Sequence, residues 1–208
     1  MIDGVAFASC YVYSPAGESV ICARSRLLRA LLKEGDAQFM FKYAVRVRQQ
    51  MEPTAGLAGF FLADDVLVPV PRSAPGAGGT WAAAELARAL VEAGVGSTMW
   101  PGLHRISAVR KSATATKGCR PSVARHFDSF RLEPPGIRPR RVVIIDDVIT
   151  KGRTLLAAAA RLREALPDTQ IRAFALLRTK GMITDLTNLL EPCRGEIRWL
   201  RGDARRIP

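Results

Sequence analysis

The chain has 208 residues, of which 48% are hydrophobic and 24% charged, values that are typical of a soluble globular protein with room for one α/β domain. Its apolar runs are too short to cross a membrane as a helix, so a transmembrane class is excluded. The formal net charge of +12 at pH 7 favours a polyanionic ligand or partner, such as a phosphorylated metabolite or nucleic acid.

The first 62 residues predict a small N-terminal appendage made of a strand and two helices. The strand covers 5–13 and ends at the Ser-Pro-Ala-Gly turn, after which 19–22 could pair with it as a hairpin. Helices are expected over 24–32, which Gly35 would end, and over 37–51.

From residue 65 onward, strands and helices alternate along the chain. The expected strands are 65–70, 95–99, 142–145 and 171–177, with an edge strand at 197–200, and the expected helices are 80–92 and 155–166. This alternation predicts a Rossmann-like parallel sheet flanked by helices, in one domain that spans 1–208. In such folds ligands bind at the carboxyl ends of the strands.

The segment 103–138 is predicted to be a basic flexible loop with strand-like fragments at most. Residues 105–141 hold ten lysines or arginines but only two acids, Asp128 and Glu133. A solvated connection, a nucleic-acid-binding arm and a lid over a site all fit this composition.

The cysteines give little support to a zinc site, because they form no Cys-x-x-Cys pair and have only two histidines as companions. We therefore expect unpaired thiols in a reducing compartment. The N-terminus lacks a basic segment followed by an apolar core, so no secretory signal is evident and a cytoplasmic location is expected. The cysteines and histidines considered for a zinc site are Cys10, Cys22, Cys119, Cys193, His104 and His126.

The most informative segment is 141–155, which reads Arg-Val-Val-Ile-Ile-Asp-Asp-Val-Ile-Thr-Lys-Gly-Arg-Thr-Leu. A buried strand is expected to end at Asp146 and Asp147, and a short loop then leads into a helix. Exposed amides and hydroxyls at a helix start can hold a phosphate, and the carboxylates can accept hydrogen bonds from vicinal ribose hydroxyls. The alternative is an ordinary strand-to-helix crossover, in which acids and Gly serve the turn.

This segment resembles the phosphoribosyl pyrophosphate (PRPP) signature of type I phosphoribosyltransferases, and Lys151 is its one departure, since the family usually has a small residue there. The resemblance implies the type I phosphoribosyltransferase fold. It also implies that Asp146 and Asp147 are catalytic residues that bind the ribose 2′- and 3′-hydroxyls and hold Mg²⁺ indirectly, through those hydroxyls or water. The 5′-phosphate would be bound by Thr150, Lys151, Gly152, Arg153 and Thr154.

A second segment resembles the competence-related, ComF-like amidophosphoribosyltransferase branch of that family, in which a Val-Pro-Val-Pro segment precedes the pyrophosphate-binding loop. Here 68–71 has that sequence, and a Gly-rich stretch follows to residue 79. The resemblance implies that Arg72 and Ser73 bind pyrophosphate and that the basic loop is a lid whose Arg110 and Lys111 contact the leaving pyrophosphate. Taken alone, a Pro- and Gly-rich connection explains the same residues.

The resemblance predicts a phosphoribosyltransferase that binds PRPP with Mg²⁺ and transfers the 5-phosphoribosyl group to a nitrogen acceptor, a nucleobase or an amine, with release of pyrophosphate. Thr150 stands where the purine-salvage branch often has an acid, which lowers the case for hypoxanthine or guanine. One alternative is a non-catalytic PRPP- or nucleotide-sensing protein that binds nucleic acid through its basic surface. A weaker alternative is a phosphatase or nucleotide hydrolase. The acceptor and the formation of a homodimer stay open.

Overall fold

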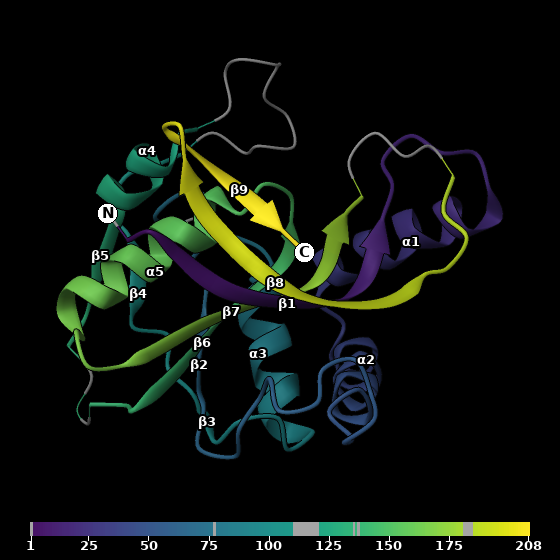
Figure 1. Ribbon diagram of the computed structural model, residues 1–208, viewed down its shortest axis with the longest axis horizontal. Helices are drawn as coiled ribbons and strands as arrows, with labels where there is room; N and C mark the ends of the chain where they lie inside the picture. The colour runs from purple at the N-terminus through teal and green to yellow at the C-terminus, as the bar shows by residue number, and fades with distance from the viewer. Residues whose placement is uncertain (1, 77, 110–120, 135, 137, 181–184) are drawn as a thin grey trace.

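The computed structural model describes residues 2–76, 78–109, 121–134, 136, 138–180 and 185–208. Within these residues seven strands form one sheet. The sheet lies at the centre of the molecule (Figure 1). Across the sheet the order is β3 (Thr98–Met99), β2 (Val66–Pro69), β6 (Arg141–Ile149), β7 (Gln170–Thr179), β1 (Gly4–Tyr13), β8 (Leu190–Leu200) and β9 (Asp203–Ile207). The first five strands in this order run parallel, whereas β8 and β9 are antiparallel to their neighbours.

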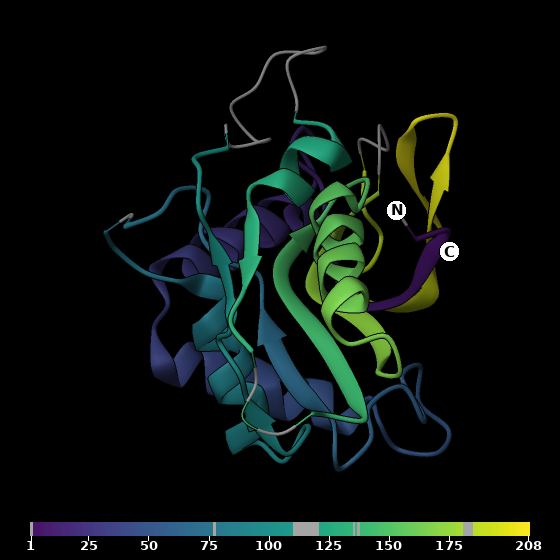
Figure 2. The ribbon, with the colours of Figure 1, turned by 90° about the vertical axis from the view of Figure 1, so that its left-hand side faces the viewer.

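Helices cover both faces of this sheet. One face packs against α1 (Val20–Glu34), α2 (Ala37–Gln49) and α3 (Ala82–Glu92). The other face packs against α5 (Arg153–Ala165), α4 (Val123–Asp128) and a small sheet of β4 (Leu103–Arg105) and β5 (Phe130–Leu132), as Figure 2 shows. The predicted class of a mostly parallel sheet flanked by helices is therefore confirmed. None of the described helices is long and apolar enough to cross a membrane.

The signature strand, which is β6, is buried on both faces, as its run of four β-branched residues at 142–145 predicts. Val143 and Ile145 pack in the core under α1–α3, whereas Val142 and Ile144 pack under α5, because successive side chains of a strand point to opposite faces. The strand continues to Ile149, so the two aspartates lie within it rather than after its end.

The N-terminal segment was expected to be an appendage, but its strand lies inside the sheet, between β7 and β8. Phe7, Ala8 and Val12 are almost fully buried, which requires a neighbour on each side and a layer on each face. The expected hairpin at 19–22 is wrong: Ser19 caps α1, and its hydroxyl accepts a hydrogen bond from the Cys22 amide at 3.2 Å.

Other element boundaries follow local signals. The first helix ends at Gly35, which has a φ of +73°, as predicted. In the basic segment the structure has β4, α4 and β5 outside residues 110–120, and the helix was missed because six residues are too few to show helical periodicity. The predicted edge strand at 197–200 belongs to β8, and β9 forms the edge.

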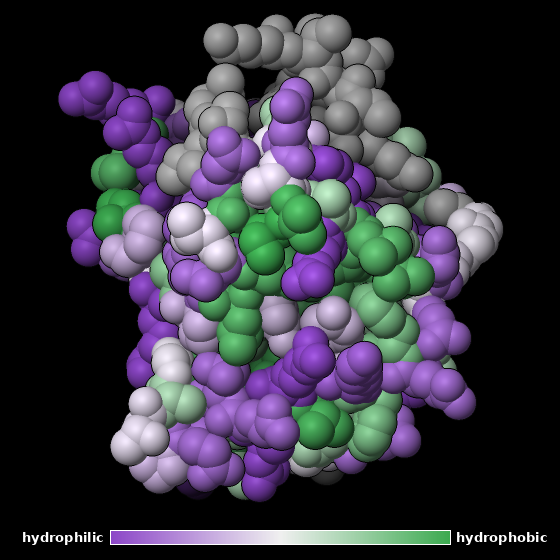
Figure 3. Space-filling model, turned by 90° about the vertical axis from the view of Figure 1, so that its right-hand side faces the viewer, coloured by the Kyte–Doolittle hydropathy of each residue, from purple (hydrophilic) through white to green (hydrophobic). Residues whose placement is uncertain are grey.

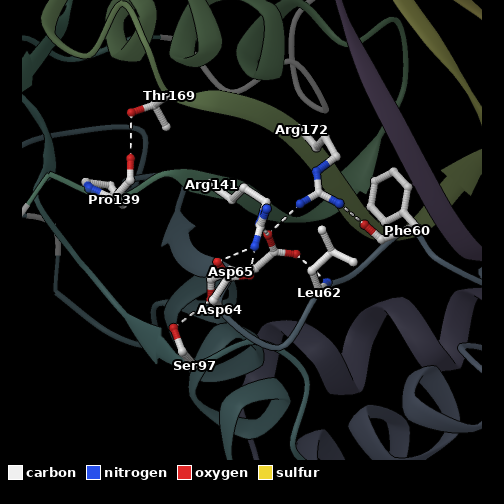
Figure 4. A network of polar contacts seen from close by, with 9 residues as sticks. All are labelled: Phe60, Leu62, Asp64, Asp65, Ser97, Pro139, Arg141, Thr169 and Arg172. Atoms are coloured by element: carbon white, nitrogen blue, oxygen red, sulfur yellow. Dashed lines mark hydrogen bonds and ion pairs between the residues drawn. The ribbon is translucent and has the colours of Figure 1, made fainter.

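A polar network joins the strands at their amino ends, away from the carboxyl edge (Figure 4). Asp65 is fully buried, accepts a hydrogen bond from the Leu62 amide at 2.7 Å and forms an ion pair with Arg172 of β7. Next to it, the exposed Asp64 accepts a hydrogen bond from Arg141 Nε at 2.9 Å. These contacts hold the strands together at their amino ends, whereas loops follow the strands at the carboxyl edge.

The face on the right of Figure 1 mixes apolar and hydrophilic surface, as Figure 3 shows. The first helix contributes two of the most exposed large apolar residues, Val20 at 68% and Leu27 at 59% exposure. Apolar side chains are thus exposed on this face beside hydrophilic ones.

Candidate functional site

The two aspartates of the signature lie near the carboxyl end of β6. The Asp147 amide donates a hydrogen bond to Asp146 Oδ1 at 2.9 Å. Asp147 is only 7% exposed, and its carboxylate forms an ion pair with Lys33 of α1. Lys33 was not among the predicted site residues, and it brings the N-terminal segment to the acidic pair.

The surroundings shift the pKa values of the two carboxyl groups in opposite directions. Burial, and then the charge of Asp147, raises the pKa of Asp146 well above its ordinary value. Burial would also raise the pKa of Asp147, but the Lys33 ammonium and the hydrogen bond with Asp146 together outweigh it and hold that pKa below its ordinary value. The pair therefore combines a carboxyl group that favours its proton with an ionised carboxylate, which together can donate to and accept from neighbouring hydroxyls.

The donor set of this pair fits a magnesium ion bound together with a substrate. Mg²⁺ prefers oxygen ligands and is usually held by one or two carboxylates plus substrate phosphates and water. In the part of the chain that the structure describes, no three His, Cys, Asp or Glu side chains converge into a cage. Asp146 and Asp147 could hold the ion only with oxygens from a ligand or from water.

Residues 150–154, here called the phosphate loop, follow β6 and line a small hollow together with Asp146, Val148, Ile149 and Leu155. Thr150 and Lys151 are exposed, whereas Arg153 and Thr154, in the first turn of α5, are half-buried. Within the described residues no side chain caps α5, and because the first amides of a helix have no partner inside the helix, this end is suited to an anion.

Gly152 is the residue that lets this loop approach the sheet. Its φ is +87°, a conformation that favours glycine, and a Cβ there would lie 2.7 Å from the Ile197 side chain of β8. The loop is therefore packed directly against the C-terminal strands.

Both cationic side chains of the phosphate loop bind one carboxylate from β9. Lys151 Nζ lies 3.0 Å from Asp203 Oδ2, and Arg153 Nε and Nη2 donate to Asp203 Oδ1 and Oδ2 at 2.5 and 2.7 Å. Arg153 Nη1 also donates to the Pro121 carbonyl at 3.2 Å. The unusual lysine of the signature thus has a local partner.

The second predicted loop leaves the same edge of the sheet from the neighbouring strand. After β2, Val70 still donates to the Ile145 carbonyl at 2.9 Å, and the half-buried Arg72 and Ser73 follow. Their carbonyls accept hydrogen bonds from Arg105 Nε and from the Val109 amide, each at 2.8 Å. The structure therefore brings Arg72, Ser73 and the phosphate loop to one edge, while the predicted contacts Arg110 and Lys111 lie outside the described residues.

Arg105 of β4 is a further cation of this edge. It is 7% exposed and lies 4.4 Å above the Phe130 ring. Burial lowers its pKa to about 10, and the charge of Asp146 opposes that shift, so the two side chains interact electrostatically. In the sequence Arg105 is one of ten basic residues in 105–141, and nothing in the pattern predicts a role for it.

His126 and His104 take no part in the hollow. Burial, with the charges of Arg105 and Arg153, lowers the pKa of His126 to about 4, so the ring is neutral, and it stacks on Phe130 with 6.4 Å between centroids. His104 Nε2 lies 3.2 Å from Glu133 Oε1, away from the residues that line the hollow.

The sequence was also compared with protein-family models and with curated proteins. No family model matches it, and no curated protein is significantly similar to it. The case for a function therefore rests on the residues of this site and on their arrangement.

Proposed function

We propose that this chain is a phosphoribosyltransferase that binds PRPP with Mg²⁺ and transfers the 5-phosphoribosyl group to a nitrogen acceptor with release of pyrophosphate. One observation carries the proposal. The strands β2 and β6 are adjacent and parallel. Their carboxyl ends bring together the acidic pair, the phosphate loop after β6 and the Gly-rich loop after β2.

Each part of PRPP has a chemically suitable partner at this edge. The amides at the start of α5 suit the 5′-phosphate, and the Asp146–Asp147 pair suits the vicinal ribose hydroxyls. Arg72 and the loop that it begins suit the pyrophosphate, because a guanidinium offers forked donors to phosphate oxygens.

The ionised Asp147 also has a role in the proposed transfer. Glycosyl transfer passes through an oxocarbenium-like state, and a buried negative charge beside the ribose favours the positive charge that develops on the ring. Mg²⁺, when bound at the acidic pair through ligand oxygens, would help to neutralise the departing pyrophosphate.

The first experiment is a calorimetric titration of PRPP, with and without Mg²⁺, into wild type, Asp147→Asn and Asp168→Asn. Asp168 is an exposed acid in the turn after α5, so its substitution removes the same charge away from the site. We expect saturable, Mg²⁺-dependent binding to wild type and Asp168→Asn, and its loss in Asp147→Asn. Binding that is absent from wild type, or equal in all three proteins, would refute the proposal.

An acceptor screen follows, with pyrophosphate release as the readout and nucleobases and amines as acceptors. Release that depends on one acceptor and disappears in Asp147→Asn would complete the case. PRPP binding without release from any acceptor would instead favour a PRPP-sensing protein.

The C-terminal hairpin supports that second function. Arg198 of β8 and Arg205 of β9 are exposed and directly opposite each other. Glu196 forms an ion pair with Arg198, and the two arginines with this one carboxylate leave a net positive charge that suits an anionic partner. A sensing protein would bind nucleic acid here, with an affinity that falls steeply as salt increases. Loss of that salt dependence in Arg198→Gln/Arg205→Gln, with PRPP binding unchanged, would establish the hairpin as the nucleic-acid surface.

A further inference from the structure

The cationic side chains of the phosphate loop already bind an anion, the carboxylate of Asp203 in β9. This side chain binds both Lys151 and Arg153, and its Oδ1 also accepts a hydrogen bond from the Ala204 amide at 2.8 Å. The Arg153 guanidinium, followed by Lys151, holds the pKa of Asp203 far below its ordinary value, so the group is ionised throughout the physiological range.

The contact is part of the fold rather than a chance meeting of surface side chains. The hairpin of β8 and β9 lies beside α5 (Figure 2), and Ile197 of β8 packs closely over Gly152. Arg153 binds Asp203 through two nitrogens and Pro121 through a third, which fixes its guanidinium. The carboxylate is therefore held in a set position next to the hollow that the loop lines.

The two cations differ in how firmly they are held. Arg153 is 21% exposed and bidentate, whereas the Lys151 side chain is 56% exposed and makes one contact with Asp203 at 3.0 Å. An exposed single ion pair contributes little, and an ammonium has three donors, so Lys151 can exchange partners at small cost. Arg153 is expected to stay on Asp203.

We propose that Asp203 is a specificity-determining residue, which competes with the ligand phosphate for Lys151 of the phosphate loop. A phosphate monoester carries a charge of about −1.5 to −2 at pH 7 and can displace a carboxylate from the ammonium. A singly charged anion gains no such advantage. This inference rests on the proposed function, because it assigns the loop to a phosphate, and it gives Lys151 a role at the position where it departs from the family pattern.

The experiment measures binding of ribose 5-phosphate by calorimetry at low salt to wild type, Asp203→Asn and Glu196→Gln. Glu196 is the matched control, since it is a carboxylate of the same hairpin that pairs with Arg198 and not with the loop. We expect Asp203→Asn to bind about threefold more tightly, which corresponds to about 0.6 kcal/mol, and Glu196→Gln to bind like wild type. In a Lys151→Gln background the gain from Asp203→Asn should largely disappear.

Unchanged or weaker binding in a folded Asp203→Asn protein would overturn the inference. If that variant fails to fold, Lys151→Gln alone decides, because the inference requires it to weaken ribose 5-phosphate binding and equal binding refutes it. Tighter binding of ribose 5-phosphate in Asp203→Asn, without Mg²⁺-dependent binding of PRPP, would sustain the inference and reject the proposed transferase. Mg²⁺-dependent binding of PRPP that Asp203→Asn leaves unchanged would reject the inference and sustain the proposed transferase.

Discussion

Lys33 of α1 forms an ion pair with Asp147 of β6, so a helix from the first part of the chain sets the charge of the signature strand. The carboxylate is nearly buried, whereas the Lys33 side chain is half exposed. Because Asp147 is surrounded by protein, its ionised form depends on Lys33 together with the hydrogen bonds that its carboxylate makes with Asp146 and the backbone. The N-terminal segment is therefore part of the candidate site, a role that its distance in sequence from the signature conceals.

Replacing Lys33 by Met should make PRPP binding more sensitive to acid. Lys33 lowers the pKa of Asp147, and without it burial would raise that pKa, so the carboxylate would take up its proton at a higher pH. As pH falls from 8 to 5, we expect the variant to lose binding at a higher pH than wild type. Calorimetry over that range tests this, with the exposed Lys42→Met of α2 as control; identical profiles for all three proteins would contradict it.

Gly152→Ala should destabilise the fold more than Gly202→Ala does. Both glycines have positive φ values, +87° and +77°, but only at Gly152 would the new methyl group meet a side chain, that of Ile197, while at Gly202 no described atom lies within 4 Å. We expect a loss of about 1 kcal/mol for Gly202→Ala and about 2–5 kcal/mol for Gly152→Ala by urea unfolding. Equal losses would show that Ile197 moves aside.

The network at the amino ends of the strands gives a matched pair of substitutions. Asp65 is fully buried and paired with the buried Arg172, whereas its neighbour Asp64 is exposed and paired with Arg141. Asp65→Asn leaves a buried guanidinium without its counter-charge and should cost about 3–5 kcal/mol of unfolding free energy. Asp64→Asn should change stability little. A small effect at Asp65 would mean that water reaches Arg172.

His126 should make the fold sensitive to acid. Its pKa is about 4 in the folded chain against an ordinary 6.5, so between these values the unfolded chain binds the extra proton and the folded chain does not. Stability due to this group therefore falls as pH is lowered through that window, by about 3 kcal/mol in total.

His126→Phe, which keeps a ring against Phe130, should remove this part of the acid dependence. Unfolding free energies of wild type and His126→Phe from pH 7 to 4 test it, with His104→Phe as the control for a partly exposed histidine. Parallel pH profiles for wild type and His126→Phe would show that the imidazole does not titrate as its burial requires.

The local features of this protein can be read from its sequence because they depend on neighbours in the chain. Four β-branched residues predict a strand buried on both faces, Gly35 predicts the end of α1, and the order of strands and helices predicts a mostly parallel sheet. The sequence also predicts that the acidic pair and the phosphate loop lie towards the carboxyl edge of the sheet, although β6 extends past both aspartates to Ile149.

Tertiary structure alone decides which distant side chains meet at that edge. The position of β1 inside the sheet, the pairing of Lys33 with Asp147, the approach of Arg105 to Asp146 and the capture of Lys151 and Arg153 by Asp203 each join segments far apart in the chain. The segments that form α1, β8 and β9 each contain more than one basic residue, and composition does not show which of these residues pairs with an acid. That choice depends on the packing of the sheet and helices, which sets the burial and separation of each pair, and hence the strength of their interaction.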